Sequence, residues 1–525
     1  MSLIANNFLY EAGVDWVKAS QANPDRCLDA IWRVGHVAWK HHAGRFADGA
    51  LDNPPFHFGA TDLKPPARNV PRLGAAAGRT SRTLHVATTI YSVGGHTRVL
   101  AKWALRDTNT TPGIVLIHQT EPCPKFFEEI VAKAGGQIIS LPISEPMMVR
   151  AAMLREISKQ FDRVVLHTHP NDPVPVVAFA AASGPPVVMF NHAHFSFCLG
   201  STVSDAIINT MEYFRGITKN HRFPRRTAIL TGTPGLTPLG SNPIDKAAAR
   251  KALGIDESVP LAMSIAQENY FKPMEGYDFF RTASRLMESN PSVHLLIVGV
   301  PPESALISSE LRNNSRFHCV GPVLDPIPYY RAADVCLESF PMPSLGSVIE
   351  AVAYGEAFPV PVYGPGECVL RVSMAPVLSY SYRPVDEDAY LAFVNSLLEN
   401  RSETREKARQ LRLSMIQYDE GWGGVVDELN RFIDGLKHAP GEIPEVPMND
   451  CSDCQILARM NPAKLATALN ILPYDRATRS QLSAAARGLI NPLDAAGQII
   501  CRPLSAVARR VRGVMQRPEA ATQKA

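Results

Sequence analysis

Five histidines stand where the chain turns from apolar segments to loops. His167 and His169 lie in LHTHP, His192 and His194 lie in FNHAH, and His96 follows a pair of glycines. Side chains at alternate positions of a strand share a face, so each pair is expected to point to one side of a strand end. Imidazole titrates near neutrality and can exchange a proton with a substrate hydroxyl. His96 and His192 are therefore the candidate catalytic residues, with purely structural histidines as the alternative.

A metal site is a second interpretation of these histidines. No acidic or cysteine partner accompanies them, so a substrate-binding surface that includes an acid/base is preferred. Cys451 and Cys454 have C-x-x-C spacing, but no second pair follows at the spacing of a zinc site. We therefore expect no metal ion.

A second group of residues could hold a phosphate. The stretch ESFPMPSLGSVIEAVAYG, residues 338–355, changes from a proline-bent loop to a helical repeat. The first turn of a helix offers unpaired N–H groups and the positive end of the helix dipole. Ser347 adds a hydroxyl, and Glu350, one turn later, can accept two hydroxyls of a ribose. Lys272 follows a predicted strand and supplies a charge suited to a diphosphate. An ordinary N-capped helix explains Ser344 and Ser347 equally well.

These residues need elements that bring several strand ends together. From residue 82, strand-like segments alternate with helical ones, and the alternation restarts after a Gly- and Pro-rich break near 231–243. This pattern predicts parallel sheets covered on both faces, with ligands at the carboxyl ends of the strands. The predicted fold is α/β with two doubly wound, Rossmann-like domains and helical N- and C-terminal extensions. The expected boundaries are 1–80 for a helical extension ending in a linker from 51, 81–240 and 241–437 for the two domains, and 438–525 for a helical, basic tail.

Composition limits the class of protein. The chain has 525 residues, which is enough for two domains with large cores. A net charge of +3 argues against a dedicated nucleic-acid binder. Nine cysteines without regular spacing argue against a disulfide framework. The N-terminus lacks the pattern of a signal peptide, and no segment reaches the ~20 apolar residues that span a bilayer. We expect a cytoplasmic protein, with a peripheral position at the inner membrane face as the alternative.

Four motifs in order resemble one family. GGHTRVL, YFKPMEGYDFF, VGPVLDPIPYYRAADVCLESF and LGSVIEAVAYG resemble segments of glycosyltransferases of the GT-B fold. Within that fold the chain is similar to the bacterial family-4-like enzymes, with some features of the O-GlcNAc-transferase type. The resemblance covers roughly residues 82–436. Two positions differ from the family pattern, where Met342 replaces a glutamate and Gln267 replaces an arginine.

The resemblance implies a set of roles for the donor site. Lys272 would meet the diphosphate of a nucleotide-sugar, and Glu350 would hold the ribose. The donor would be a UDP- or GDP-sugar, and no further cofactor is expected. The residues implied to contact this donor are Gly94, Gly95, Lys272, Gly321, Pro322, Val323, Ser344, Leu345, Gly346, Ser347 and Glu350.

The resulting expectation is a metal-independent glycosyltransferase that acts on a glycan or another hydroxyl acceptor, in bacterial surface glycan or glycoconjugate synthesis. A sugar-nucleotide epimerase and a non-catalytic scaffold of the same fold are the alternatives. The basic tail from residue 503 has apolar residues on one helical face, which suggests contact with anionic lipid and a lipid-linked acceptor. A solvated tail or a packed helix is the preferred interpretation of that segment.

Overall fold

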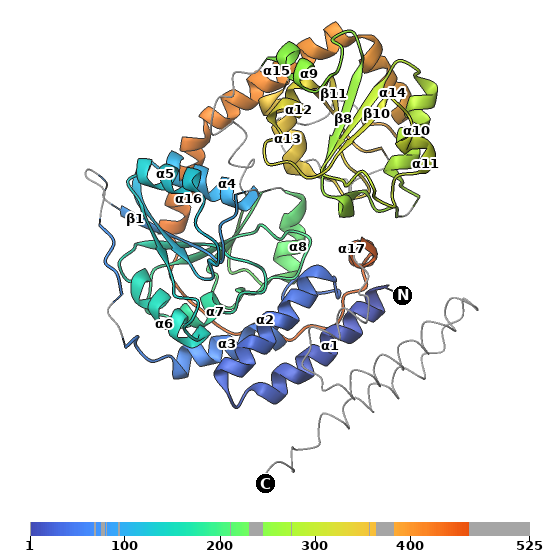
Figure 1. Ribbon diagram of the computed structural model, residues 1–525. Helices are drawn as coiled ribbons and strands as arrows, with labels where there is room; N and C mark the ends of the chain where they lie inside the picture. Colours follow the sequence, from blue (N-terminus) through green and yellow to red (C-terminus); the bar gives the residue numbers. More distant parts are fainter. Residues whose placement is uncertain are drawn as a thin grey trace, which may run out of the picture.

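The chain folds into two parallel-sheet units, one above the other in Figure 1. The computed structural model describes residues 2–67, 70–74, 79, 81–92, 95–210, 212–229, 245–274, 276–355, 357–363 and 383–460. Within these ranges one sheet has seven strands and the other has five. The α/β class and the two doubly wound units expected from the sequence are confirmed.

The first sheet has the strand order β3-β2-β1-β4-β5-β6-β7, and all neighbours are parallel. Its central strands β2 and β4 are buried along their length because helices cover both faces. The edge strand β3 is only partly buried. The strands are β1 (Ser81–Ala87), β2 (Thr110–Leu116), β3 (Gln137–Ser140), β4 (Arg163–His167), β5 (Val187–Phe190), β6 (Ala206–Asn209) and β7 (Thr227–Ile229).

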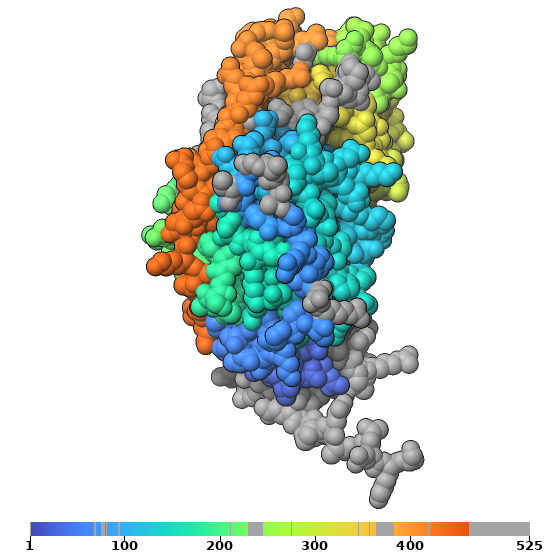
Figure 2. All heavy atoms as spheres, turned by 90° about the vertical axis from the view of Figure 1, so that its left-hand side faces the viewer, coloured from blue at the N-terminus to red at the C-terminus, as the bar shows by residue number. Residues whose placement is uncertain are grey.

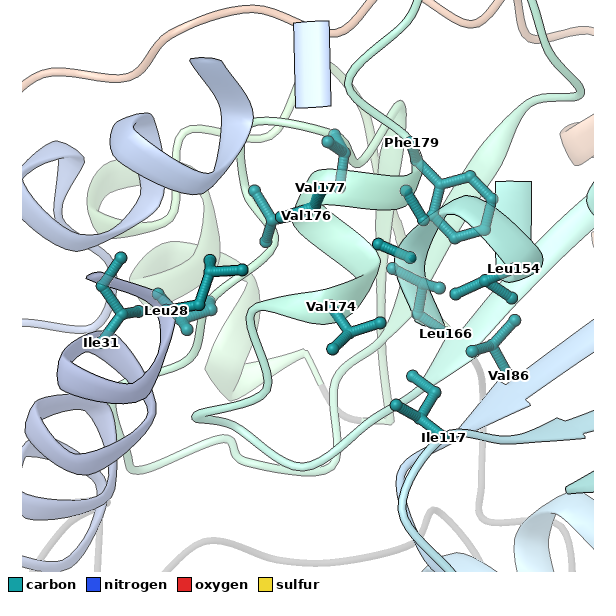
Figure 3. Close-up of a cluster of buried hydrophobic side chains, with 14 of the residues drawn as sticks. Leu28, Ile31, Val86, Ile117, Leu154, Leu166, Val174, Val176, Val177 and Phe179 are labelled. Carbon is teal, nitrogen blue, oxygen red and sulfur yellow. The ribbon is translucent and has the colours of Figure 1, made fainter. Parts of the chain in front are cut away.

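Helices of this unit pack on opposite faces of the sheet. α4 (Gly95–Arg106) and α5 (Lys125–Lys133) cover one face with a cluster around Leu100 and Phe127. α6 (Met147–Ser158) and α7 (Val174–Ala178) cover the other face. Figure 3 shows this second cluster, in which side chains of α2, α6 and α7 meet those of β1 and β4. A further helix, α8 (Tyr213–His221), lies between β6 and β7 in the chain.

The N-terminal extension forms part of the same core. It consists of α1 (Ser2–Ser20), α2 (Pro24–Lys40), α3 (Gly49–His57) and a π-helical turn, Phe58–Asp62. Asn23 and Asp48 cap α2 and α3 by accepting hydrogen bonds from their first turns. The expected linker from residue 51 is wrong up to residue 62. Pro54 and Pro55 suggested a loop, but buried residues such as Leu51 pack this segment against the core.

The second sheet has the order β10-β9-β8-β11-β12 and is also parallel. Gly299 follows β9 with φ of +94°, and a Cβ there would lie 2.5 Å from the carbonyl oxygen of Ala266. Only glycine fits that close approach of two strand ends. The strands are β8 (Leu261–Ile265), β9 (His294–Val298), β10 (Phe317–Val320), β11 (Val335–Leu337) and β12 (Phe358–Val360).

Helices again cover both faces of this sheet. One cluster includes side chains of α10, α11 and α14, and another includes those of α9, α12, α13 and α15. A short 3-10 turn, η2 (Glu268–Phe271), follows β8, and the Phe340–Pro341 peptide before α13 is cis. The helices are α9 (Lys246–Ala252), α10 (Phe279–Ser289), α11 (Ser309–Arg312), α12 (Ile327–Ala332), α13 (Leu345–Tyr354), α14 (Glu387–Glu399) and α15 (Arg401–Glu420).

After the second unit the chain returns to the first. α15 runs along the side of the molecule (Figure 2), and α16 (Trp422–Asp434) packs on the first sheet with Trp422 against Trp103. A domain boundary at residue 437 would assign α16 to the second unit, whereas its buried contacts lie with the first. An extended segment then leads to α17 (Ser452–Met460), which packs against α1. In the part of the chain that is described, no helix is long and apolar enough to cross a bilayer.

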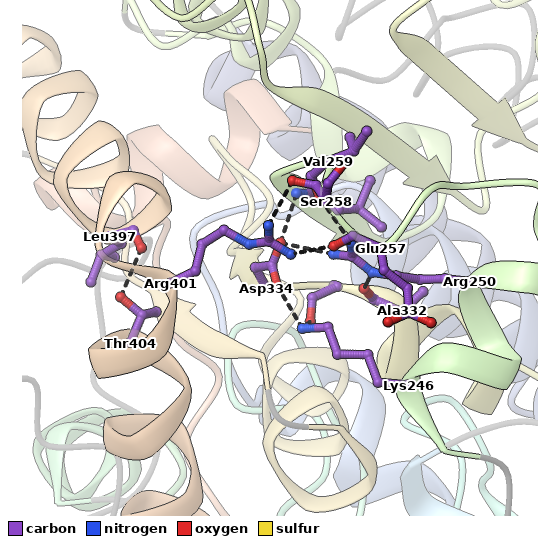
Figure 4. A network of polar contacts seen from close by, with 12 residues as sticks. Lys246, Arg250, Glu257, Ser258, Val259, Ala332, Asp334, Leu397, Arg401 and Thr404 are labelled. Atoms are coloured by element: carbon purple, nitrogen blue, oxygen red, sulfur yellow. Dashed lines mark hydrogen bonds and ion pairs between the residues drawn. The ribbon is translucent and has the colours of Figure 1, made fainter.

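A buried carboxylate joins the two ends of the second unit (Figure 4). Asp334, just before β11, accepts from Lys246 at 2.6 Å and from Arg250 at 2.8 Å, and it pairs with Arg401 at 3.2 Å. The backbone N–H of Leu261 donates to the same carboxylate at 2.9 Å. Burial opposes ionisation of Asp334, but the neighbouring cations outweigh it and lower its pKa. The first and last helices of the unit, α9 and α15, are thereby tied to its central strand.

Replacement of Asp334 should therefore destabilise the second unit. Asp334→Ala leaves Arg250 buried without its counter-ion, and such losses typically cost about 3–5 kcal/mol. Urea unfolding followed by circular dichroism measures the change. The matched control is Glu403→Gln, which removes an exposed carboxylate that pairs with Lys407 within α15. Equal midpoints for the two variants would contradict the role assigned to Asp334.

Candidate functional site

The two units meet where α4 of the first unit and α13 of the second face each other (Figure 1). Arg98 on α4 forms an ion pair with Glu350 on α13. Both side chains are partly buried, with exposed fractions of 27% and 19%. The carboxyl ends of β1 and β4 lie on the side of α4, and the loop after β11 leads into α13. The candidate site is therefore built from the strand ends of both units.

Two of the predicted histidines, together with His85, form a chain of hydrogen bonds between their rings. His85 Nδ1 lies 3.1 Å from His167 Nε2, and His167 Nδ1 lies 3.1 Å from His192 Nε2. His85 and His167 are buried, whereas His192 is partly exposed. Burial lowers the pKa of each ring, so all three are neutral at pH 7. Sequence analysis found His167 and His192 but not His85, which sits inside an ordinary strand pattern.

The direction of this chain follows from its buried end. Among the described residues, His85 Nε2 has no hydrogen-bond partner. An unpaired N–H is rarer in protein interiors than an unpaired acceptor, so the proton of His85 is assigned to Nδ1. His85 then donates to His167, and His167 donates to His192 Nε2. The exposed ring of His192 is left with an N–H at Nδ1, which makes it a hydrogen-bond donor at the site.

His96 presents a hydrogen-bond acceptor, whereas His192 presents a donor. Its Nε2 lies 3.0 Å from the carbonyl oxygen of Thr89, and a carbonyl can only accept. In the neutral ring Nδ1 therefore carries the lone pair. Burial lowers the pKa of His96, which keeps that lone pair available at neutral pH. The ring packs edge-on against His192 at a centroid distance of 6.1 Å. His96 is thus the better general base of the two candidates.

The other two predicted histidines, His194 and His169, pack in clusters different from that of His96 and His192. The expectation that His192 and His194 share one side is wrong, because β5 ends at Phe190 and the alternation of a strand stops there. His194 stacks on Phe214 of α8 and bonds the hydroxyl of Thr210. It belongs to the packing of α8.

His169 turns toward the N-terminal helices. The centroid of its ring lies 4.4 Å from that of Trp39, and the ring stacks on that of His36. Both residues belong to α2. Trp32 of the same helix packs on His118, which follows β2. These five rings, Trp32, His36, Trp39, His118 and His169, are each only partly buried. They form a partly exposed aromatic surface between α2 and the strand ends of the first unit.

The second unit contributes the N-terminal end of α13. The hydroxyl of Ser344 donates to the carbonyl of Ile265 at 2.8 Å, so it does not cap the helix. Gly346 is exposed, and a Cβ at that position would meet no atom within 4 Å. Leu345 begins the helix. The first turn of α13 is therefore open to a ligand that accepts hydrogen bonds.

Glu350 lies one helical turn after Gly346, and Tyr330 of α12 holds its carboxylate. Tyr330 donates from its hydroxyl to Glu350 Oε2 at 3.0 Å, while Arg98 pairs with Oε1. Ser347 also interacts with the Tyr330 hydroxyl. Burial raises the pKa of Tyr330, so the phenol stays protonated and remains a donor. Neither Tyr330 nor Arg98 was assigned a role from the sequence, although Arg98 lies in the motif GGHTRVL.

The remaining predicted residues surround this end of the second sheet. Lys272 follows η2 and is exposed. Gly321 follows β10, where its carbonyl accepts from Gly299, and Pro322 is exposed while Val323 packs partly on the core. Gly95 begins α4 with open space around it, whereas Gly94 lies outside the described residues. The strand ends thus bring Lys272, Gly321 and α13 to one edge of the sheet.

Among the described residues, no group of three or more histidine, cysteine or acidic side chains has the arrangement of a metal site. Cys451 and Cys454 are free thiols with sulfur atoms 3.1 Å apart at the start of α17. Burial raises the pKa of Cys454, which disfavours the thiolate that a metal would require.

Comparison with solved structures defines the fold. The chain resembles a variant of the O-GlcNAc transferase of Thermobaculum terrenum, with a TM-score of 0.51, 13% identity, and 85% of this chain and 83% of that chain covered. The protein has the GT-B fold, as the motif resemblance implied. No protein-family profile and no curated protein sequence matches the chain.

Two further solved structures are similar at lower TM-scores. HepE of Anabaena, in complex with UDP and glucose, has a TM-score of 0.48 at 14% identity over 68% of this chain and 100% of that chain. The UDP-GlcNAc 2-epimerase of Neisseria meningitidis, bound to UDP-GlcNAc, has a TM-score of 0.43 at 13% identity over 66% and 98%.

The neutral histidines predict acid lability. Each binds a proton near pH 6.5 when unfolded but much lower when folded, so the unfolded state binds more protons below pH 6.5. Below pH 6.5, each such histidine lowers the free energy of unfolding by about 1.4 kcal/mol for every pH unit of acidification. The histidines with strongly lowered pKa are His36, His42, His85, His167, His192 and His194.

Three buried carboxyl groups oppose this effect in part. Burial raises the pKa of Asp52 and Asp172 to about 6 and that of Glu338 to about 7, so each gains stability on acidification. The histidines outnumber them, and the free energy of unfolding should fall between pH 7.5 and pH 5.5. Urea midpoints at the two pH values measure it. An unchanged or higher midpoint at pH 5.5 would show that these histidines are protonated in the folded protein.

Proposed function

We propose that this protein is a glycosyltransferase that uses a nucleotide-diphosphate sugar. The observation that carries the proposal is the open first turn of α13, followed one turn later by Glu350, which pairs with Arg98 of α4, the helix that also carries His96. Backbone N–H groups suit a diphosphate, and a carboxylate suits the two hydroxyls of a ribose. The similarity of fold to an O-GlcNAc transferase supports the same class.

The chemistry follows from the placement of these groups. His96 Nδ1 takes the proton of the acceptor hydroxyl, and His192 donates a hydrogen bond from its exposed N–H. The acceptor oxygen forms a bond to the anomeric carbon of the sugar, and the bond from that carbon to the diphosphate oxygen breaks. The first turn of α13 and Lys272 stabilise the charge on the leaving diphosphate. No step of this scheme uses a metal ion, so the activity is proposed to be metal-independent.

The acceptor is proposed to bind the first unit. The aromatic surface of Trp32, His36, Trp39, His118 and His169 presents flat rings beside neutral imidazole N–H groups. Flat aromatic faces with nearby hydrogen-bonding groups suit a sugar ring, and a glycan acceptor of the bacterial surface is therefore part of the proposal. The basic tail proposed to contact anionic lipid, and with it a lipid-linked acceptor, lies outside the described residues.

Two alternatives make different demands on the site. A sugar-nucleotide epimerase needs acid/base groups on both faces of the donor sugar itself, whereas the groups of the first unit are neutral histidines beside an aromatic surface. A non-catalytic scaffold needs no neutral histidine with a free lone pair at the cleft. Transfer from labelled UDP- and GDP-sugars to added glycans separates the three.

The donor site can be tested by nucleotide binding. Lys272→Ala and Glu350→Ala should each weaken UDP or GDP by at least about tenfold, which corresponds to ~1.4 kcal/mol. Binding is measured by calorimetry and by thermal shift, since a ligand at 100 times its Kd adds about 2.7 kcal/mol to stability. Lys251→Ala, at an exposed position of α9, is the matched control. Wild-type affinity in both site variants would remove the donor-site assignment.

The acid/base role can be tested by turnover. His96→Ala should lower kcat by about 10² to 10⁴ while donor affinity is unchanged, because only the proton acceptor is lost. His192→Ala should produce a smaller loss. His57→Ala is the control, since that exposed histidine pairs with Glu442 far from the cleft in the N-terminal extension. Full turnover of the His96 variant would point to a mechanism without a protein base.

A further inference from the structure

The ion pair between Arg98 and Glu350 occupies the group to which the proposed function assigns the ribose. Arg98 takes one oxygen of the carboxylate and Tyr330 takes the other. Because each carboxylate oxygen already holds one partner, the two hydroxyls of a ribose, which would each take one oxygen, compete with Arg98 and Tyr330 for Glu350. Tyr330 is fixed, because it is buried between α12 and α13 and its ring stacks on Tyr354. Arg98 belongs to the opposite unit and is the partner that can leave.

Displacement has a cost that depends on what else the ligand carries. With 27% of its side chain exposed, Arg98 is only partly hydrated, so the loss of its counter-ion is more costly than at an open surface. A neutral nucleoside would take Glu350 and leave the guanidinium unpaired. A nucleoside diphosphate would take Glu350 and also supply a new anion. The displacement of Arg98 therefore weakens the binding of a nucleoside. In a nucleoside diphosphate the same cost is compensated, because the diphosphate becomes the new partner of Arg98.

The new anion would lie within reach of Arg98. Gly346 precedes Glu350 by four residues, which is one helical turn or about 6 Å along the axis. A diphosphate at the open first turn of α13 is thus one turn from the present position of the guanidinium. Guanidinium groups bind phosphate oxygens through two N–H donors at once. A change of side-chain rotamer covers such a distance without movement of α4.

We propose that Arg98 exchanges Glu350 for the diphosphate when the donor binds, and that this exchange makes the site select nucleoside diphosphates over nucleosides. The inference rests on the proposed function, because it takes the ligand of Glu350 to be a ribose. Arg98 is a contribution of the first unit to the donor site of the second. The exchange also makes both the empty and the occupied site bridge the two units.

The test compares two ligands in three proteins. Arg98→Met keeps the length of the side chain and removes its charge. It should bind uridine or guanosine about tenfold more tightly than the wild type, because Glu350 is no longer taken. It should bind the matching diphosphate about tenfold more weakly. Lys272→Met, whose ammonium is exposed and has no ion-pair partner among the described residues, should weaken the diphosphate and leave the nucleoside unchanged.

The outcomes separate the exchange from the donor site itself. Calorimetry, with competition for weak nucleosides, measures the ratio of the two dissociation constants. An unchanged ratio in Arg98→Met, together with diphosphate binding that Lys272→Met weakens, overturns the exchange and leaves the donor site standing. A wild type that binds neither UDP nor GDP overturns both. Arg98→Gln, which retains a hydrogen bond to Glu350, is measured beside Arg98→Met, so that unfolding of one variant does not decide the result.

Discussion

Asp334 is the charge on which the second unit depends. Its carboxylate is shared by the first helix of that unit, by the central strand β8 through Leu261, and by Arg401 at the start of the helix that leaves it. Three cations around one buried anion would repel one another without it. The direction of α15 is set at this point. Because α15 leads into α16 on the first sheet, the same anion contributes to how the two units are joined.

Polar groups described between the two units serve more than one purpose. Arg98 and Glu350 form an ion pair between the two units, and Tyr330 donates a hydrogen bond to the same carboxylate. On the first unit, the chain of imidazoles positions His192 through two buried rings that contact no substrate. In each unit a polar side chain is thus held by buried groups of the same unit, His192 by imidazoles and Glu350 by Tyr330. This explains why a strand pattern as plain as that of β1 contains a histidine at position 85.

Much of the fold could be predicted because short apolar runs rich in Ile and Val, such as PGIVLIHQ and VHLLIVGV, alternate with longer helical segments, which is typical of buried parallel strands. The short strands β6 and β7 were missed, since four and three residues are too few to show a period. The helix α3 was missed because Pro54 and Pro55 outweigh its short apolar face in any local pattern. The partner of Glu350 could not be found either, since contact between Arg98 and α13 exists only once both units are folded and docked. Residues that act within one loop and helix, such as Ser344 to Glu350, were the accessible part of the site.

The extension at the N-terminus is joined to the last described segment of the chain. Arg45 donates to the carbonyl of Val446, Asp48 accepts from the N–H of the same residue, and Gly49 donates to Pro444. Val446 follows Arg45 by 401 positions and Asp48 by 398 positions in the sequence. At a synthesis rate of about 5–20 residues per second, roughly 20–80 s pass between the synthesis of α3 and that of its partner segment. During that time the surface of the N-terminal extension that residues 443–449 later cover lacks its partner.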